Sequence, residues 1–199
     1  MAPSSELRLV LATHNPHKVE EVSRILAPYG IAVEPLPEPV ELPSEDGETF
    51  AENALGKARA AAAATGRGAI AEDSGIEAEA LGGAPGVRSA RYAGAHASDT
   101  ENLEKLISEV PPRTGLRYVC ALAYVDPQAG GERVFLGECP GRMAGGPAGG
   151  GGFGYDPVFV VPGRDCERTM AELSESEKDA ISHRGRAVRE LAGWLRGKT

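Results

Sequence analysis

The 199-residue sequence contains few aromatic side chains, only one tryptophan and only three cysteines. Cys120, Cys139 and Cys166 include no Cys-x-x-Cys pair, so their spacing indicates neither a zinc site nor a disulfide framework. No stretch approaches the roughly 20 apolar residues of a membrane-spanning helix. The sequence has no basic segment followed by an apolar run, so we expect no signal peptide. We therefore expect a protein of the reducing cytoplasm.

Positive charge is also in short supply, with 21 Lys and Arg against 29 Asp and Glu and a net charge of −8. Nucleic-acid binding depends on basic residues that neutralise phosphates, so this balance disfavours it. The sequence lacks the Gly-x-x-x-x-Gly-Lys-Ser/Thr pattern, which disfavours a P-loop ATPase. With 41% hydrophobic residues, we expect a single globular domain over residues 1–199. Residues 1–6 are expected to be a disordered extension.

Hydrophobic periodicity and turn residues predict the order of the elements. We expect strands over 7–13, 31–33 and 69–71, and an antiparallel hairpin of the strands 116–125 and 132–137; an apolar run covers 158–161. We expect helices from Asn15-Pro16 to Gly30, over 49–65, from the capping box Ser98–Glu101 to about Val110, after the capping box Ser174–Glu177, and after Ser182. Residues 35–46 and 81–94 are expected to be irregular. This order predicts an α/β fold with a central mixed β-sheet flanked by helices.

The first segment with chemical character joins a strand to a helix. It consists of Thr13, His14, Asn15, Pro16, His17 and Lys18. Anions bind at such junctions because free backbone N–H groups and the helix dipole favour negative charge. The alternative is an ordinary strand-to-helix turn with a solvated lysine, since the glycines of a phosphate loop are missing.

Acidic residues form a second candidate group. Glu72 and Asp73 follow an apolar strand and precede Ser74-Gly75, where we expect a turn, and Glu45 lies in a separate acidic loop. Converging carboxylates repel one another unless a cation neutralises them, and Mg²⁺ commonly binds one or two carboxylates together with substrate phosphates. The alternative for Glu45 is a solvated surface residue.

Two further segments combine aromatic or basic residues with turn residues. Phe153 lies between Gly152 and Gly154, so a flat ligand could stack on its ring; the alternative is a core phenylalanine beside a surface loop. His183 and Arg184 lie in the first turn of a predicted helix, which is unfavourable for cations unless an anion is near. The alternative there is a solvated basic face.

Together these segments resemble the inosine-triphosphate pyrophosphatase family, the Ham1-like non-canonical purine nucleoside triphosphatases. The resemblance depends on motifs that follow one another in the family's order along nearly the whole chain. They are Leu11-Ala12-Thr13-x-Asn15-x-x-Lys18, Thr49-Phe50-x-Glu52-Asn53-Ala54 with Lys57, Glu72-Asp73-Ser74-Gly75, Gly83-Ala84-Pro85-Gly86-Val87-x-Ser89-Ala90-Arg91-Tyr92, Gly152-Phe153-Gly154-Tyr155-Asp156-Pro157 and Ile181-Ser182-His183-Arg184.

The resemblance implies two lobes with an active-site cleft between them, a homodimer and a Mg²⁺-dependent reaction. In that reaction, ITP, dITP, XTP or dXTP is hydrolysed at the α–β phosphoanhydride bond to the monophosphate and pyrophosphate. This removes deaminated purines from the nucleotide pool before they enter DNA or RNA. No contact with nucleic acid or with a membrane is expected.

The resemblance also implies roles for individual residues. Thr13 to Lys18 would hold the triphosphate with Lys57, and Glu45, Glu72 and Asp73 would bind the metal. Asp73 would be the general base, and Ser74 would touch the substrate. The base and sugar would be surrounded by Phe153, Gly154, Tyr155, Asp156, Lys178, His183 and Arg184.

Two positions depart from the family pattern: Glu72 replaces a usual Asp, and Asp179 replaces a usual Asn. The first keeps the negative charge but lengthens the reach of the carboxylate by one methylene group. A related pyrophosphatase of the septum-formation-inhibitor type, with a different base preference, is an alternative. A regulatory module that binds a nucleotide without hydrolysing it is another, although the carboxylates and Lys18 argue against it.

Overall fold

Six strands form a mixed β-sheet in the computed structural model, which describes residues 7–161 and 167–197. Their order in the sheet is β2-β1-β3-β4-β5-β6. The strands are β1 (Leu7–Leu11), β2 (Ile31–Pro35), β3 (Ala69–Ala78), β4 (Gly115–Asp126), β5 (Gly131–Met143) and β6 (Phe159–Val160). Strand β1 pairs in parallel with β2 and β3, whereas β5 pairs antiparallel with β6. The predicted mixed sheet is therefore confirmed.

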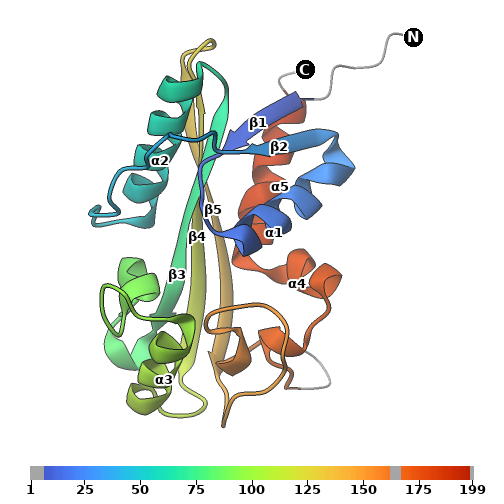
Figure 1. Cartoon of the computed structure of the whole chain (residues 1–199). Coiled ribbons are helices and arrows are strands. Elements are labelled where there is room, and N and C mark those ends of the chain that lie inside the picture. The colour runs from blue at the N-terminus through green and yellow to red at the C-terminus, as the bar shows by residue number, and fades with distance from the viewer. Residues whose placement is uncertain (1–6, 162–166, 198–199) are drawn as a thin grey trace. The chain divides into compact units, whose positions relative to one another are not determined.

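Five α-helices accompany these strands in the described residues. They are α1 (Pro16–Leu26), α2 (Phe50–Thr65), α3 (Asp99–Glu109), α4 (Glu175–Ile181) and α5 (His183–Arg196), as Figure 1 shows. Thr49, Ser98 and Ser174 each begin a helix with a complete capping box. These boxes satisfy backbone N–H groups that a helix start otherwise leaves without an acceptor. The boxes predicted at Ser98 and Ser174 are confirmed.

The structure corrects several predicted boundaries. The strand predicted at 69–71 is present but longer than expected, because β3 runs unbroken from Ala69 to Ala78. The turn expected at Ser74-Gly75 is therefore wrong. Strand β3 lies between β1 and β4, so both of its edges are paired, and charged partners described below accommodate its acidic side chains. Strand β5 continues past the predicted end at Gly137 to Met143, and β6 has only two residues.

The structure also differs from the prediction in the segment 81–94, expected to be irregular, and at the end of the helix expected to reach Gly30. Residues 81–94 include the 3-10 helix Gly86–Arg91, and a second one, Glu79–Leu81, immediately precedes Gly82. Helix α1 ends at Leu26, and the 3-10 helix Ala27–Tyr29 fills the distance to Gly30. Gly30 has a φ of 71°, a left-handed conformation that glycine adopts without strain. The predicted extension 1–6 and Cys166 lie outside the described residues.

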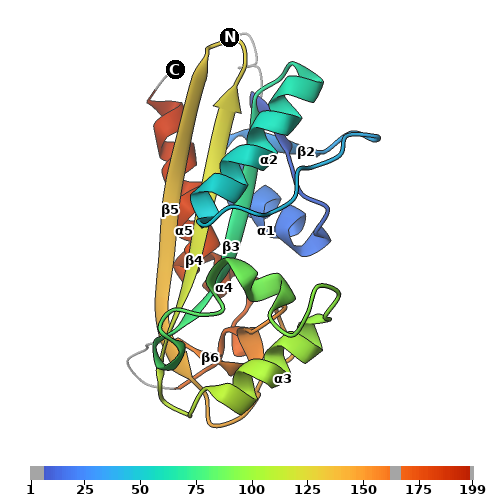
Figure 2. The same cartoon turned by 90° about the vertical axis from the view of Figure 1, so that its left-hand side faces the viewer.

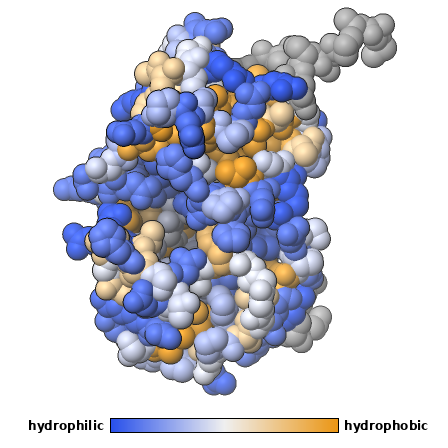
Figure 3. Space-filling model, in the orientation of Figure 1, coloured by the Kyte–Doolittle hydropathy of each residue, from blue (hydrophilic) through white to orange (hydrophobic). Residues whose placement is uncertain are grey.

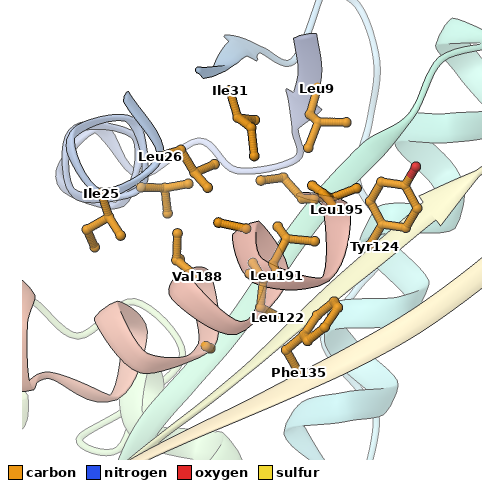
Figure 4. Packing of buried hydrophobic residues seen from close by; sticks show 14 of the residues in the cluster. Leu9, Ile25, Leu26, Ile31, Leu122, Tyr124, Phe135, Val188, Leu191 and Leu195 are labelled. Atoms are coloured by element: carbon orange, nitrogen blue, oxygen red, sulfur yellow. The ribbon is translucent and has the colours of Figure 1, made fainter. Parts of the chain in front are cut away.

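The chain divides into two compact units, each with its own hydrophobic core. The first unit comprises residues 1–73, 120–136 and 184–199. In it, α2 covers one face of the sheet, and α1 and α5 cover the other (Figures 1 and 2). Figure 4 shows the core on the α1 and α5 side. Its side chains include Leu9, Leu26, Leu122, Val188 and Leu191, which are at most 1% exposed.

The second unit comprises residues 74–119 and 137–183. Its core includes Ile76, Leu106, Val158, Phe159 and Met170, none of which is more than 1% exposed. The thiols of Cys120 and Cys139 are buried in the first and second core, respectively. Each unit therefore has an apolar interior that can hold a polar cluster in place.

The surface is largely hydrophilic on the face drawn in Figure 3, with apolar residues in small groups. Among the described residues, the exposed large hydrophobic side chains are Leu7, Ile107 and Leu136. None of the helices in 7–161 and 167–197 is long and apolar enough to cross a membrane.

Candidate active site

The segment from Thr13 to Lys18 leaves the carboxyl end of β1 and opens α1. Leu11 is in parallel register with Ile70 of β3, and Ala12 N donates to Ile70 O at 2.8 Å. Parallel strands run in the same direction, so the residues after Leu11 lie beside those after Ile70. The pairing therefore places this segment next to Glu72 and Asp73, as expected for an anion site at the end of a strand.

Asn15 is the N-cap of α1. Its Oδ1 accepts hydrogen bonds from the backbone N–H groups of His17 at 3.0 Å and Lys18 at 3.3 Å. Thr13 Oγ1 accepts from Asn15 N at 3.1 Å. Two of the amides expected to face an anion thus already have an acceptor. His14 and His17 are exposed, so triphosphate binding by this segment stays a prediction that depends mainly on Lys18.

Glu72 and Asp73 are neighbours on a strand, so their side chains point to opposite faces of the sheet. Glu72 faces the α1 and α5 side, where it contacts Lys18 and Arg184. Asp73 faces α2, where it contacts Asn53 and Lys57. The two acidic residues that look equivalent in the sequence therefore belong to different clusters.

Glu72 belongs to a buried charge network. Its carboxylate lies 2.6 Å from Lys18 Nζ and 3.4 Å from Arg184 Nη2, and Arg184 also pairs with Glu21. Burial alone raises the pKa of Glu72, but Arg184 and Lys18 outweigh it and hold the pKa well below its usual range. Cys120 Sγ lies 3.5 Å from the same carboxylate, and burial raises the pKa of this thiol well above its usual value.

This network explains a basic residue in the first turn of α5. A cation at the N-terminus of a helix is unfavourable unless an anion lies close to it. For Arg184, the carboxylates of Glu21 and Glu72 supply this negative charge. Arg184 is only 1% exposed, and its role at the base and sugar stays a prediction. Glu72 likewise stays a predicted metal ligand, while its observed contacts position Lys18 and Arg184.

Asp73 is held from the α2 side. Asn53 Nδ2 donates to Asp73 Oδ2 at 2.9 Å, and Lys57 Nζ lies 3.8 Å from Asp73 Oδ1. Lys57 also donates a hydrogen bond to Glu45, which brings the Glu45 loop to the same place. Burial raises the pKa of Asp73 more than Lys57 and Asn53 lower it. Burial also lowers the pKa of Lys57, but Asp73 and Glu45 outweigh it and raise that pKa overall.

Metal binding at this cluster depends on its carboxylates. Within 7–161 and 167–197, no three His, Cys, Asp or Glu side chains gather closely enough to hold an ion by themselves. Glu45 and Asp73 nevertheless both lie against the Lys57 ammonium. Two hard oxygen ligands of this kind fit Mg²⁺, which takes its other ligands from water and substrate phosphates.

In the second unit, Asp156 is the centre of a polar cluster. Its Oδ2 accepts hydrogen bonds from Lys178 Nζ at 2.7 Å and from the backbone N of Phe153 at 3.0 Å. The Lys178 ammonium also lies 4.8 Å from the centre of the Phe153 ring. Gly152 is required here, because a Cβ at its φ of 68° would lie 2.0 Å from Asp156 Oδ2. Three of the predicted base-binding residues are therefore in contact.

Several of the other residues predicted to bind the substrate in this unit make contacts within the protein. Tyr155 is buried, and its hydroxyl donates to Ser89 O at 2.7 Å. Gly154 has a φ of 60°, which gives the loop its turn. His183 is 5% exposed and stacks on Tyr118, and Ser74 is partly buried. Their contacts with a substrate stay predictions.

Comparison with known sequences matches residues 9–194 to the Ham1 family, which is nearly the whole chain. This chain belongs to the Ham1 family. Relatives named dITP/XTP pyrophosphatase occur in Yersinia pseudotuberculosis and Frankia alni. Each is 50% identical to this Ham1 chain. The match to the Yersinia protein covers 95% of this chain and 98% of that protein. The match to the Frankia protein covers 96% of this chain and 98% of that protein.

Solved structures agree with this assignment. A HAM1 protein from Coxiella burnetii is 41% identical, with a TM-score of 0.83 over 96% of this chain and 99% of that one. The Ham1 protein of Staphylococcus aureus is 38% identical, with the same TM-score over 96% of this chain and all of that one. The Ham1 fold expected from the sequence is therefore confirmed.

Sequence reasoning assigned no role to several residues of these clusters, among them Asn53 and Glu21. Asn53 belongs to the motif at the start of α2, and its spacing of four residues from Lys57, which predicts a shared helix face, is the signal that could have identified it. Glu21 lies one helical turn after Lys18, where spacing predicts a shared face. A sequence alone does not reveal that Glu21 pairs with Arg184, which is 163 positions away.

Proposed function

We propose that this Ham1 protein hydrolyses ITP, dITP, XTP and dXTP to the monophosphate and pyrophosphate, and thereby removes deaminated purines from the nucleotide pool. The names of its relatives in Yersinia and Frankia support this substrate class. The observation that carries the proposal is the cluster of Lys57, Glu45, Asn53 and Asp73 beside the segment that ends in Lys18. It combines cations for a polyphosphate with a carboxylate suited to act on water.

Asp73 is the proposed general base. Its Oδ2 is held by Asn53, so the carboxylate has a fixed direction in which to accept a proton from water. As Asp73 takes the proton, the water oxygen forms a bond to the α-phosphorus. The bond from that phosphorus to the bridging oxygen breaks, and its electron pair leaves with pyrophosphate. The proton then passes from Asp73 to solvent.

The cations stabilise the charge on the phosphate chain. Lys18 and Lys57 have compact ammonium groups held by carboxylates, so they are oriented before the substrate arrives. Glu45 and Asp73 would hold Mg²⁺, with Glu72 as a further candidate. When bound, this ion supplies neutralisation of the negative charge that develops on the phosphoryl oxygens.

Base recognition is proposed for the second unit. Phe153 offers a ring for stacking, and Asp156, Lys178 and His183 offer polar atoms. A 6-oxo purine differs from adenine in hydrogen-bonding pattern, so correctly directed polar groups reject the amino group of adenine. Ser74, Gly154, Tyr155 and Arg184 complete the residues proposed around the substrate, with Thr13 to Lys18 at the phosphates.

The test is pyrophosphate release from ITP, XTP, ATP, GTP, CTP and UTP, with Mg²⁺ and with a chelator. We expect strong preference for ITP and XTP, and loss of activity with chelator. A profile that favours other bases would instead support a pyrophosphatase of the septum-formation-inhibitor type. Tight binding without hydrolysis would support a regulatory nucleotide-binding module.

A homodimer and a cytoplasmic location are part of the same proposal. Both are supported by the Ham1 family resemblance, and the location also by the scarcity of cysteine in the sequence. Sedimentation of the purified chain over a range of concentrations tests the dimer. Fractionation of cells that express the full chain tests the location.

A further inference from the structure

Tyr118 on β4 contacts two of the residues proposed to recognise the base. Its hydroxyl donates to Asp156 Oδ1 at 3.0 Å, and its ring stacks on His183 with a centroid distance of 4.6 Å and an interplanar angle of 13°. Tyr118 is buried, at 6% exposed, as are Asp156 at 3% and His183 at 5%. None of the sequence motifs includes Tyr118.

The hydroxyl of Tyr118 completes the anchoring of Asp156. Lys178 and the Phe153 backbone donate to Oδ2, whereas Tyr118 donates to Oδ1. A carboxylate with donors on both oxygens cannot rotate about its terminal bond without breaking one of these contacts. The direction in which Asp156 presents its remaining lone pairs is thus set partly by Tyr118.

The ring of Tyr118 is itself held between two other rings. Phe159 stacks on it with a centroid distance of 4.3 Å, and His183 stacks at 4.6 Å. Two rings at these distances cannot share one face, so they occupy opposite faces of Tyr118. Phe159 in turn packs against Gly141 of β5, where a Cβ would lie 2.4 Å from the Phe159 ring. The imidazole of His183 is therefore packed on Tyr118, which is packed in turn on Phe159.

We propose that Tyr118 is a positioning residue for base discrimination, which holds the Asp156 carboxylate and the His183 imidazole in fixed mutual orientation. This inference rests on the proposed function, because it requires that Asp156 and His183 face a purine. Hypoxanthine and adenine differ in the donors and acceptors on one edge of the ring. Polar side chains that can rotate form hydrogen bonds with either purine, whereas side chains held in one orientation match the donors and acceptors of only one of them.

The variant Tyr118→Phe tests the hydroxyl separately from the ring, because phenylalanine keeps the stack on His183. We expect the ratio of kcat/KM for ITP to that for ATP to fall about tenfold, mainly through a higher KM for ITP. The control is Tyr124→Phe. Tyr124 lies on the same strand, is similarly buried, and its hydroxyl also donates to a carboxylate, that of Asp126 at 3.1 Å. This variant should keep the wild-type ratio.

A double-mutant cycle with Asp156→Asn tests whether Tyr118 acts through Asp156. If it does, the change from Tyr118→Phe in the ITP:ATP ratio should largely disappear when Asp156 is already Asn. Fully additive effects would overturn the inference, because a structural effect of Tyr118 elsewhere in the unit would not depend on Asp156. Thermal unfolding of each variant confirms that folded proteins are compared.

The outcomes separate the two proposals. A wild-type protein without preference for ITP over ATP overturns the proposed function, and the inference with it. Wild-type preference that survives unchanged in Tyr118→Phe overturns only the inference. An equal loss of preference in Tyr118→Phe and Tyr124→Phe also overturns it, because the effect would then follow from loss of any buried hydroxyl on β4.

Discussion

Asn53 connects Asp73 to the loop that contains Glu45. Its Nδ2 donates to Asp73 Oδ2 at 2.9 Å, and its Oδ1 accepts from Gly47 N at 2.8 Å. Both polar atoms of the amide are used, so its orientation is determined, and a Cβ on Gly47 would lie 2.6 Å from Asn53 Oδ1. A single side chain thus holds the proposed base and the backbone beside a proposed metal ligand.

Replacing Asn53 with alanine should lower kcat and leave the KM for ITP nearly unchanged, because Asp73 loses its fixed direction. The variant should also lose about 1–3 kcal/mol of unfolding free energy, since buried groups lose their partner. Asn102→Ala is a matched control. Asn102 is 2% exposed and likewise uses both polar atoms of its amide, by accepting from Ala93 N and donating to Ala90 O. It should lose similar stability and keep kcat.

Asp73→Asn tests the base directly. The amide is nearly the same size but cannot take a proton from water, so kcat should fall by about 10²–10⁴. Substrate binding, measured by titration calorimetry with ITP, should persist. Turnover close to that of the wild type would remove Asp73 as the general base and would favour another proton acceptor.

Glu72→Gln tests the buried charge network. The substitution leaves Lys18 and Arg184 with less compensating negative charge in a buried environment, so we expect a loss of about 3–5 kcal/mol in unfolding free energy. Denaturant unfolding measures it. Glu138→Gln is the control, because Glu138 pairs with Arg117 at 3.1 Å but is half exposed, and it should cost less than about 1 kcal/mol. Equal effects would contradict the network.

Glu177 offers a test of pH dependence. A hydrogen bond from Arg168, followed by those from Ser174, lowers its pKa from 4.5 to about 2. A depressed pKa means that the charged form stabilises the folded state above pH 4.5, and that this contribution is lost as the pH falls toward about 2. The difference in Tm between wild type and Glu177→Gln should therefore be largest near neutral pH and shrink below pH 4.5.

Glu101→Gln provides the comparison for that experiment. Glu101 occupies the same capping-box position in α3, and its pKa is lowered by the backbone and side chain of Ser98. Glutamine can also fill this position, so both variants test charge rather than the cap itself. If the ion pair with Arg168 matters, Glu177→Gln should show the larger change in Tm near neutral pH.

Much of the fold could be predicted from local sequence. Ser98 and Ser174 begin helices because capping depends on residues three positions apart, and Gly66 ends α2 because it adopts a left-handed conformation there. The length of β3 could not be predicted in this way. Glu72, Asp73 and Gly75 are poor strand residues by themselves, and pairing with strands on both edges overrides that tendency.

The sequence by itself determined the family, the order of the elements and the chemical types present at the candidate site. These depend on motifs whose residues are close together in the chain. Tertiary structure alone decided that Glu72 and Asp73 face different layers, that Asn53 holds Asp73, and that Tyr118 holds Asp156 and His183. The contacts of Asn53 and Tyr118 join residues 20, 38 and 65 positions apart. Their formation depends on the pairing and packing of strands and helices that are distant in the sequence, which no local pattern encodes.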